Sequence, residues 1–165
     1  MLYFAYGSNM SSRRLRSRVP SANALGTAEL EGHRLAFHKP GRLDGTGKCD
    51  VMYTGSPVEC VFGVLYDIDP QHKPLLDAAE GLGAGYESRN VCVRMRDRVH
   101  EAFTYCATIT DPGLKPLHWY RHHVLYGARE HGLPADYIAA IERVEAIRDK
   151  DVTREQAEMG IYAKN

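Results

Sequence analysis

The sequence has no excess of charge of either sign and no long apolar run. Its 21 Lys and Arg balance 21 Asp and Glu, so there is no electrostatic reason to expect nucleic acid or an anionic membrane as partner. No stretch approaches the roughly 20 apolar residues that span a bilayer, and the start has no charged segment ahead of a hydrophobic one. We therefore expect a cytoplasmic protein with a small neutral or zwitterionic ligand, no nucleic acid and no membrane partner.

The sequence also lacks paired cysteines. Its four cysteines, at positions 49, 60, 92 and 106, lie far apart without a C-x-x-C pair, and a chain of 165 residues does not need disulfides to fold. This length suffices for one continuous core and is too short for two ordinary domains. We expect a single domain over residues 1–165, with reduced and mostly buried thiols.

Strand patterns dominate the first two-thirds of the chain, and helical patterns close it. Strands are predicted at 2–6, 58–68, 86–95 and 101–109, with a hairpin-like connection at Glu31-Gly32 and a Gly-rich loop at 41–47. Helices are predicted at 12–18, from Asp69 to Gly81, and at 117–129 and 135–148. The arginines of the 12–18 helix are expected to face water. This order indicates an α+β fold and not a doubly wound sheet of regular β-α-β units.

The segment Tyr6-Gly7-Ser8-Asn9 lies where the first strand turns into a helix. Glycine permits unusual dihedral angles there, and successive backbone N–H groups at a helix entry can converge on a carboxylate or an oxyanion. The alternative is that Gly7 only makes the turn and that Ser8 or Asn9 only caps the helix. The four residues alone do not decide between these interpretations.

Glu80 closes the segment Asp77-Ala78-Ala79-Glu80-Gly81, at the predicted end of a helix. A negative charge is disfavoured at a helix C-terminus, which suits a carboxylate that accepts and returns a proton. Most glutamates at helix ends are nevertheless solvated surface groups, and Asp77, on another face, is the competing carboxylate.

Other arrangements give weaker signals. His118 and His122 are spaced i, i+4 beside His123, but no H-E-x-x-H is present, and residues 118–126 contain no acidic residue, so we expect no metal. Ser8 lacks the G-x-S-x-G elbow of hydrolases. The cysteines of the predicted strands are expected to be inert.

Three segments together resemble the γ-glutamylcyclotransferase family. The run Tyr3-Phe4-Ala5-Tyr6-Gly7-Ser8-Asn9-Met10 is similar to the N-terminal signature of that family. Asp77-Ala78-Ala79-Glu80-Gly81 with Tyr86 resembles its catalytic-glutamate segment, and Gly127-Ala128-Arg129-Glu130-His131-Gly132-Leu133-Pro134 resembles its C-terminal element. The matches occur in family order and span nearly the whole chain.

The resemblance implies a small mixed β-barrel flanked by helices, no metal or organic cofactor, and conversion of a γ-glutamyl amide into 5-oxoproline and a free amine. It implies that Glu80 is the catalytic acid/base. The residues implied to bind substrate are Tyr3, Phe4, Ala5, Tyr6, Gly7, Ser8, Tyr86, Tyr105 and Tyr120. Homodimerisation is suggested by analogy alone.

This reaction suits the residues, because the substrate supplies its own nucleophile. The α-amine of the glutamyl group attacks the γ-carbonyl to close a five-membered ring, so Ser8 need not be a nucleophile. A base such as Glu80 removes a proton from the amine and hands it to the departing amine. Three functions remain open: cyclisation of γ-glutamyl amino acids or peptides, removal of a γ-glutamyl protecting group from a biosynthetic amine, and a non-catalytic module that binds an amino-acid-like ligand or a protein partner.

Overall fold

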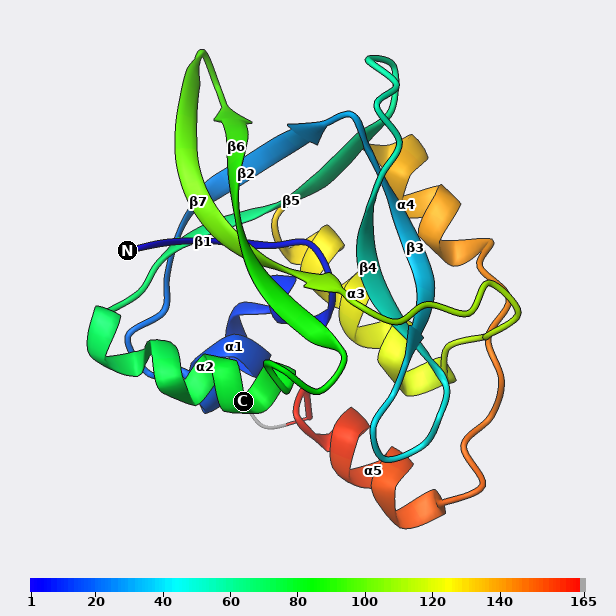
Figure 1. Ribbon diagram of the computed structural model, residues 1–165. Coiled ribbons are helices and arrows are strands. Elements are labelled where there is room, and N and C mark those ends of the chain that lie inside the picture. The colour runs from blue at the N-terminus through cyan, green and yellow to red at the C-terminus, as the bar shows by residue number, and fades with distance from the viewer. Residues whose placement is uncertain (164–165) are drawn as a thin grey trace.

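Five strands close into a barrel at the centre of the protein (Figure 1). The computed structural model describes residues 1–163, and the barrel runs in the order β1, β5, β2, β6, β7. The strands are β1 (Leu2–Ala5), β2 (Asn23–Glu31), β5 (Cys60–Asp67), β6 (Tyr86–Met95) and β7 (Arg98–Ala107). Neighbours pair antiparallel except where β1 lies parallel to β7. The predicted mixed barrel of an α+β fold is confirmed.

A separate two-stranded sheet pairs β3 (His33–Pro40) with β4 (Gly47–Tyr53), and it corrects the hairpin predicted at Glu31-Gly32. β2 instead pairs with β5 and β6. Gly32, at φ 71°, turns the chain from one sheet into the other, and its N–H donates to the Glu59 carbonyl. A glycine in the left-handed conformation suits many kinds of tight turn, so Gly32 in the sequence does not distinguish a hairpin from a crossover between two sheets.

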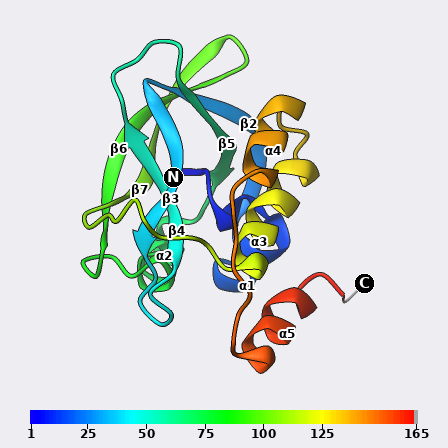
Figure 2. The ribbon, with the colours of Figure 1, turned by 90° about the vertical axis from the view of Figure 1, so that its right-hand side faces the viewer.

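Helices cover one side and the lower end of the barrel (Figures 1 and 2). They are η1 (Ser8–Met10), α1 (Ser12–Arg18), η2 (Pro70–His72), α2 (Lys73–Glu80), α3 (His118–Glu130), α4 (Ala135–Glu142) and α5 (Val152–Gly160). The predicted 135–148 helix is too long, because Ile147 leaves the helix and exchanges backbone hydrogen bonds with Pro116 and His118. The sequence predicts no element at α5, which contributes no buried residue.

The core is built around β5 and β1. Val61, Val64, Leu65 and Tyr66 of β5 are fully buried, as is Phe4 of β1. Burial of such side chains contributes roughly 1.5–3 kcal/mol each and fixes β1, whose end carries the first candidate motif. Within residues 1–163, no helix combines the length and apolar character that a membrane crossing requires.

Candidate active site

Glu80 is the last helical residue of α2, and the helix ends there as the sequence predicts. Gly81 adopts the left-handed conformation, φ 70° and ψ 49°, that closes many helices at little cost. Leu76, one turn earlier, is fully buried and anchors α2 to the core. The Glu80 side chain is only 18% exposed, so it is not an ordinary surface carboxylate.

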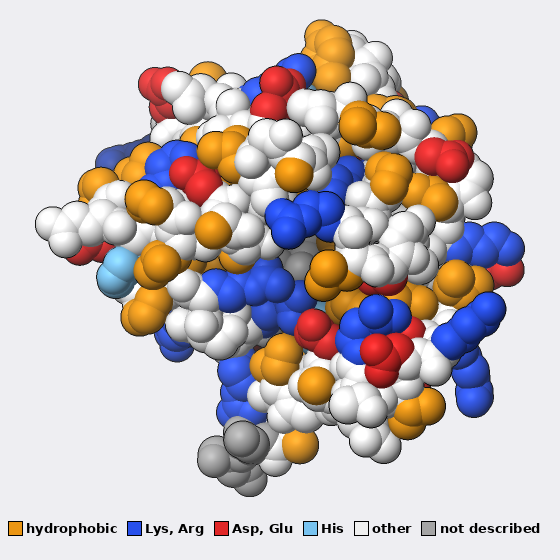
Figure 3. Space-filling model, turned by 60° about the horizontal axis from the view of Figure 1, so that its bottom comes forward, with side chains coloured by type: hydrophobic (Ala, Val, Ile, Leu, Met, Phe, Trp, Pro, Cys, Tyr) orange, Lys and Arg blue, Asp and Glu red, His pale blue; other side chains and the backbone are white. Residues whose placement is uncertain are grey.

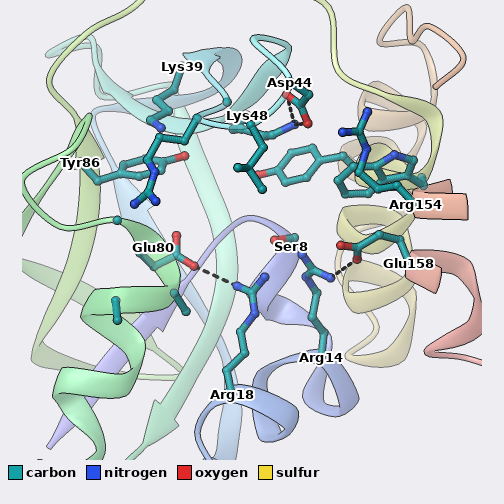
Figure 4. A pocket seen from close by; sticks show the side chains of 18 residues that line it. Ser8, Arg14, Arg18, Lys39, Asp44, Lys48, Glu80, Tyr86, Arg154 and Glu158 are labelled. Atoms are coloured by element: carbon teal, nitrogen blue, oxygen red, sulfur yellow. Dashed lines mark hydrogen bonds and ion pairs between the residues drawn. The ribbon is translucent and has the colours of Figure 1, made fainter. Parts of the chain in front are cut away.

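One oxygen of Glu80 is held by two donors, and the other is not. Oε1 accepts from Asn9 Nδ2 at 2.8 Å and from Arg18 Nη1 at 3.3 Å. Arg18 Nη1 also donates to Asn9 Oδ1 at 3.0 Å, which fixes the orientation of the amide. Within residues 1–163, Oε2 accepts no hydrogen bond, and Figure 4 shows the carboxylate facing into the cavity.

Two arginines of α1 correct the expectation that this helix presents its arginines to water. Arg18 is 26% exposed and pairs with Glu80, and Arg14 is 7% exposed and pairs with Glu158 Oε2 at 2.6 Å. Arg13 and Arg16 do face solvent. The i, i+4 spacing of Arg14 and Arg18 was the available signal, because it places both side chains on one helix face.

Glycine is needed at position 7 because the backbone lies close to Cys49, and not because its φ is unusual. Its φ is −112°, and a Cβ added there would lie 3.0 Å from Cys49 Cβ. The 3₁₀ turn after it is closed by the Met10 N–H, which donates to the Gly7 carbonyl at 3.0 Å. Ser11, and neither Ser8 nor Asn9, caps α1 by accepting from Arg14 N. Ser8 and Asn9 are both buried beside the cavity.

The cavity has an inner part lined mainly by tyrosines. We define the inner part by its lining residues: Tyr3, Tyr6, Gly7, Ser8, Asn9, Cys49, Glu80, Tyr86, Tyr105 and Tyr120. Seven of the nine predicted substrate-binding positions are among them, together with Glu80. Phe4 and Ala5 are fully buried in the core and do not line it.

The tyrosine hydroxyls fall into two groups by the direction of their hydrogen bonds. Those that donate to the protein are Tyr6, to the Tyr105 carbonyl, Tyr86, to the Cys49 carbonyl, and Tyr105, to Asp77 Oδ1. Tyr3 accepts from Asn9 Nδ2, and Tyr120 accepts from the Cys49 N–H. No acceptor for the Tyr3 hydroxyl proton is found within residues 1–163, whereas the Tyr120 hydroxyl also hydrogen-bonds the Cys49 thiol. Burial raises the pKa of both hydroxyl groups, so both remain protonated donors at neutral pH.

Asp77, the competing carboxylate, lies outside this cavity. Its two oxygens accept from Lys73 Nζ at 2.7 and 2.9 Å, and Oδ1 also accepts from Tyr105. These contacts occupy the carboxylate with structural partners. The Cys49 thiol does line the inner part, but burial raises its pKa to about 12, so it remains a thiol.

The outer part of the cavity is basic, and its volume is about 300 Å³. Figure 3 shows Lys and Arg side chains gathered around a hollow on this face. We define the outer part by its lining residues: Ser8, Arg14, Arg18, Lys39, Gly41, Arg42, Leu43, Asp44, Lys48, Ala78, Ala79, Glu80, Gly81, Tyr86, Trp119, Tyr120, Arg154 and Glu158. Ser8, Glu80, Tyr86 and Tyr120 line both parts. The carboxylate therefore lies where the two parts meet.

The histidines singled out in the sequence lie on α3, outside the inner part. His118 is exposed, whereas His123 is fully buried and contacts Arg14, Glu158 and Tyr162. Within residues 1–163, no three His, Cys, Asp or Glu side chains form a group suited to hold a metal ion.

Comparison with known proteins gives concordant matches. The AIG2-like family model matches residues 60–141. A γ-glutamylcyclotransferase of Homo sapiens is 30% identical over 161 residues, which cover 95% of this chain and 84% of the human protein. A γ-glutamylcyclotransferase of Bos taurus is 28% identical over 165 residues, with 95% and 85% covered.

Solved structures agree with these relatives. A γ-glutamyl cyclotransferase structure superposes with a TM-score of 0.88 at 26% identity, covering 99% of both chains. An uncharacterised protein of Homo sapiens superposes with a TM-score of 0.86 at 28% identity, covering 97% of this chain and 96% of the human one.

Proposed function

Since this chain belongs to the γ-glutamylcyclotransferase family and is an enzyme of that type, we propose that it cyclises the γ-glutamyl group of a γ-glutamyl amino acid, releasing 5-oxoproline and the free amine. We propose Glu80 as the catalytic acid/base. The observation that carries this proposal is the placement of one carboxylate at the junction of the two parts of the cavity, with Oε2 free of partners within residues 1–163.

The proposed reaction needs one proton shuttle and no other nucleophile. Glu80 Oε2 takes a proton from the α-ammonium group of the substrate, and the freed amine attacks the γ-carbonyl carbon. A C–N bond forms within the five-membered ring, and the C–N bond to the departing amine breaks. Glu80 passes this proton to the departing nitrogen, and the ring nitrogen, which still carries two hydrogens after the attack, gives up its second proton, so that the amine leaves as an ammonium ion and the reaction consumes no water.

A donor for the developing oxyanion is available in the inner part. The Tyr3 hydroxyl accepts a hydrogen bond from Asn9 Nδ2, which orients the oxygen and leaves its own proton for a ligand. A preorganised donor of this kind stabilises charge that appears only in the transition state. We propose Tyr3 as the ligand-facing donor, and Tyr6, Tyr86, Tyr105 and Tyr120 as supports of the cavity wall.

The decisive experiment incubates the protein with γ-glutamyl amino acids and γ-glutamyl amines and measures 5-oxoproline by chromatography. We expect release by the wild type and a loss of about 10²–10⁴-fold in kcat for Glu80→Gln, the range typical of a lost acid/base. The matched control is Glu145→Gln, whose side chain is 72% exposed and which should retain full activity.

Each alternative has its own outcome. Undiminished turnover by folded Glu80→Gln contradicts the role of Glu80. Turnover of γ-glutamyl amines in preference to amino acids supports deprotection of a biosynthetic amine. No turnover of any substrate, with ligand binding retained, supports the non-catalytic module.

A further inference from the structure

Lys39 is a buried lysine without a carboxylate partner. It is 4% exposed, and its Nζ lies 4.6 Å from the centre of the Tyr86 ring. Within residues 1–163, the Lys39 side chain forms no ion pair or hydrogen bond. Burial lowers the pKa of Lys39, while the negative charge of Glu80 opposes this shift. A desolvated ammonium group is costly unless an anion compensates it.

The other cations of the outer part differ from Lys39, because most already have carboxylate partners. Arg14 pairs with Glu158, Arg18 with Glu80, and Lys48 with Asp44. Arg154 pairs with Asp149 outside the cavity lining. Within the described residues, Lys39 and Arg42 are left without such a partner.

Arg42 reaches the same region as Lys39. A Cβ added at Gly81 would lie 3.7 Å from Arg42 Nη1, so this guanidinium lies beside the end of α2, next to Glu80. Figure 4 shows Lys39 above Tyr86, with Glu80 below it and Arg18 farther below. Both unpaired cations therefore line the outer part close to the proposed reacting centre.

We propose that Lys39, assisted by Arg42, binds the carboxylate of the leaving amino acid, so that these residues select γ-glutamyl amino acids over γ-glutamyl amines. This inference rests on the proposed function. The inner part is lined by hydroxyl donors and contains no cationic side chain, so we assign the glutamyl group to it. Glu80, as the proposed acid/base, lies beside the bond that is cleaved. The leaving group then extends into the outer part, where an anion compensates the buried ammonium of Lys39.

Two substrates that differ in one carboxylate test the proposal. γ-Glutamylethylamide is γ-glutamylalanine without the carboxylate of the leaving group. We expect the wild type to prefer γ-glutamylalanine by about 10- to 100-fold in kcat/KM, the effect typical of a hydrogen bond to a charged group. Most of the preference should appear in KM, because this carboxylate does not react.

Variants test which residues cause the preference for γ-glutamylalanine. In Lys39→Met, which keeps an unbranched apolar stem against Tyr86, the preference should fall below about threefold, and Arg42→Gln should reduce it partially. Lys150→Met, at an exposed position outside the cavity lining, is the control and should retain the full preference. Circular dichroism checks that each variant is folded.

The outcomes separate this inference from the proposed function. Equal kcat/KM for both substrates in the wild type overturns the carboxylate subsite and leaves cyclisation intact. A full preference in Lys39→Met overturns the role of Lys39. Release of no 5-oxoproline from either substrate overturns the proposed function and this inference with it. If Lys39→Met does not fold, the wild-type comparison and Arg42→Gln still decide the question.

Discussion

At the scale of single residues, Asn9 orients the Glu80 carboxylate. Its Nδ2 donates to Glu80 and Tyr3, and its Oδ1 accepts from Arg18, so both the amide nitrogen and the amide oxygen have partners. This arrangement holds Oε1 of Glu80 in place while Oε2 faces the cavity. We regard Asn9 and Arg18 as positioning residues, since their contacts act through Glu80.

Substitution Asn9→Asp tests this positioning. The new carboxylate offers no N–H to Glu80 and competes with it for Arg18, so we expect kcat to fall about 10- to 100-fold at neutral pH. The acidic limb of the pH–rate profile should move to higher pH, because a second negative charge favours protonated Glu80. Asn23→Asp, at an exposed position, is the control. An unshifted profile in Asn9→Asp would contradict the assignment.

At the scale of elements, α3 lies against η1 and the start of α1, and so supports the turn that carries Ser8 and Asn9. A Cβ added at Gly127 would lie 2.5 Å from Ser11 N and 2.6 Å from Met10 Cβ. The glycine of the predicted C-terminal element therefore permits contact between two helical segments. The sequence resemblance identified this segment, but not its neighbour in space.

Gly127→Ala should therefore destabilise the protein. We expect a loss of about 1–3 kcal/mol in the free energy of unfolding, because the overpacked contact outweighs the better helix propensity of alanine. Gly160→Ala in α5, with no neighbour within 4 Å, should be neutral or gain up to about 1 kcal/mol. Urea denaturation measures both. Equal stability of the two variants would contradict the tight contact.

The sequence predicts elements well where local patterns and burial agree. The predicted 86–95 strand coincides with β6, and the predicted end of α2 at Glu80 coincides with its left-handed glycine. The sequence does not predict β4, because Gly47, Lys48 and Asp50 interrupt its apolar pattern. The sequence does not predict α5 either, because this helix has no fully buried side chain and therefore no clear apolar face.

At the scale of the whole molecule, the cavity combines side chains from segments far apart in sequence. Glu80 comes from α2, Arg18 from α1, Lys39 from β3 and Tyr120 from α3. The sequence resemblance brought Glu80 and Tyr120 together, because it implies a catalytic role for Glu80 and substrate binding for Tyr120. It missed Arg18 and Lys39, because only the folded structure decides which charges pair, as Arg18 does with Glu80, and which remain unpaired, as Lys39 does.

Three helices also meet in a buried charged network. His123 of α3 contacts Arg14 of α1 and Glu158 of α5, and its Nδ1 lies 2.7 Å from Tyr162 Oη. Burial lowers the pKa of His123 to about 4, and Arg14 acts in the same direction, while Glu158 opposes the shift. The pKa of Glu158 is itself lowered to about 2, where its hydrogen bond from His123 and the charge of Arg14 outweigh burial.

These shifts predict that acid weakens the fold. Between pH 6.5 and about 4, unfolded His123 binds a proton that the folded protein does not, so stability falls as pH falls. The expected loss is on the order of 3 kcal/mol for this residue, with a smaller loss of the same sign from His122 and His131, whose pKa values burial also lowers. Below about pH 4.5, protonation of unfolded Glu158 adds to the loss.

Urea denaturation at pH 7, 6, 5 and 4 measures this dependence. His123→Gln should lower stability at pH 7, because it disturbs the contacts with Arg14 and Glu158, and it should flatten the slope between pH 6.5 and 4.5. His118→Gln, at an exposed position on the same helix, should keep the wild-type slope. If His123→Gln retains that slope as well, the acid sensitivity arises elsewhere, and the network does not couple α1, α3 and α5 through a neutral histidine.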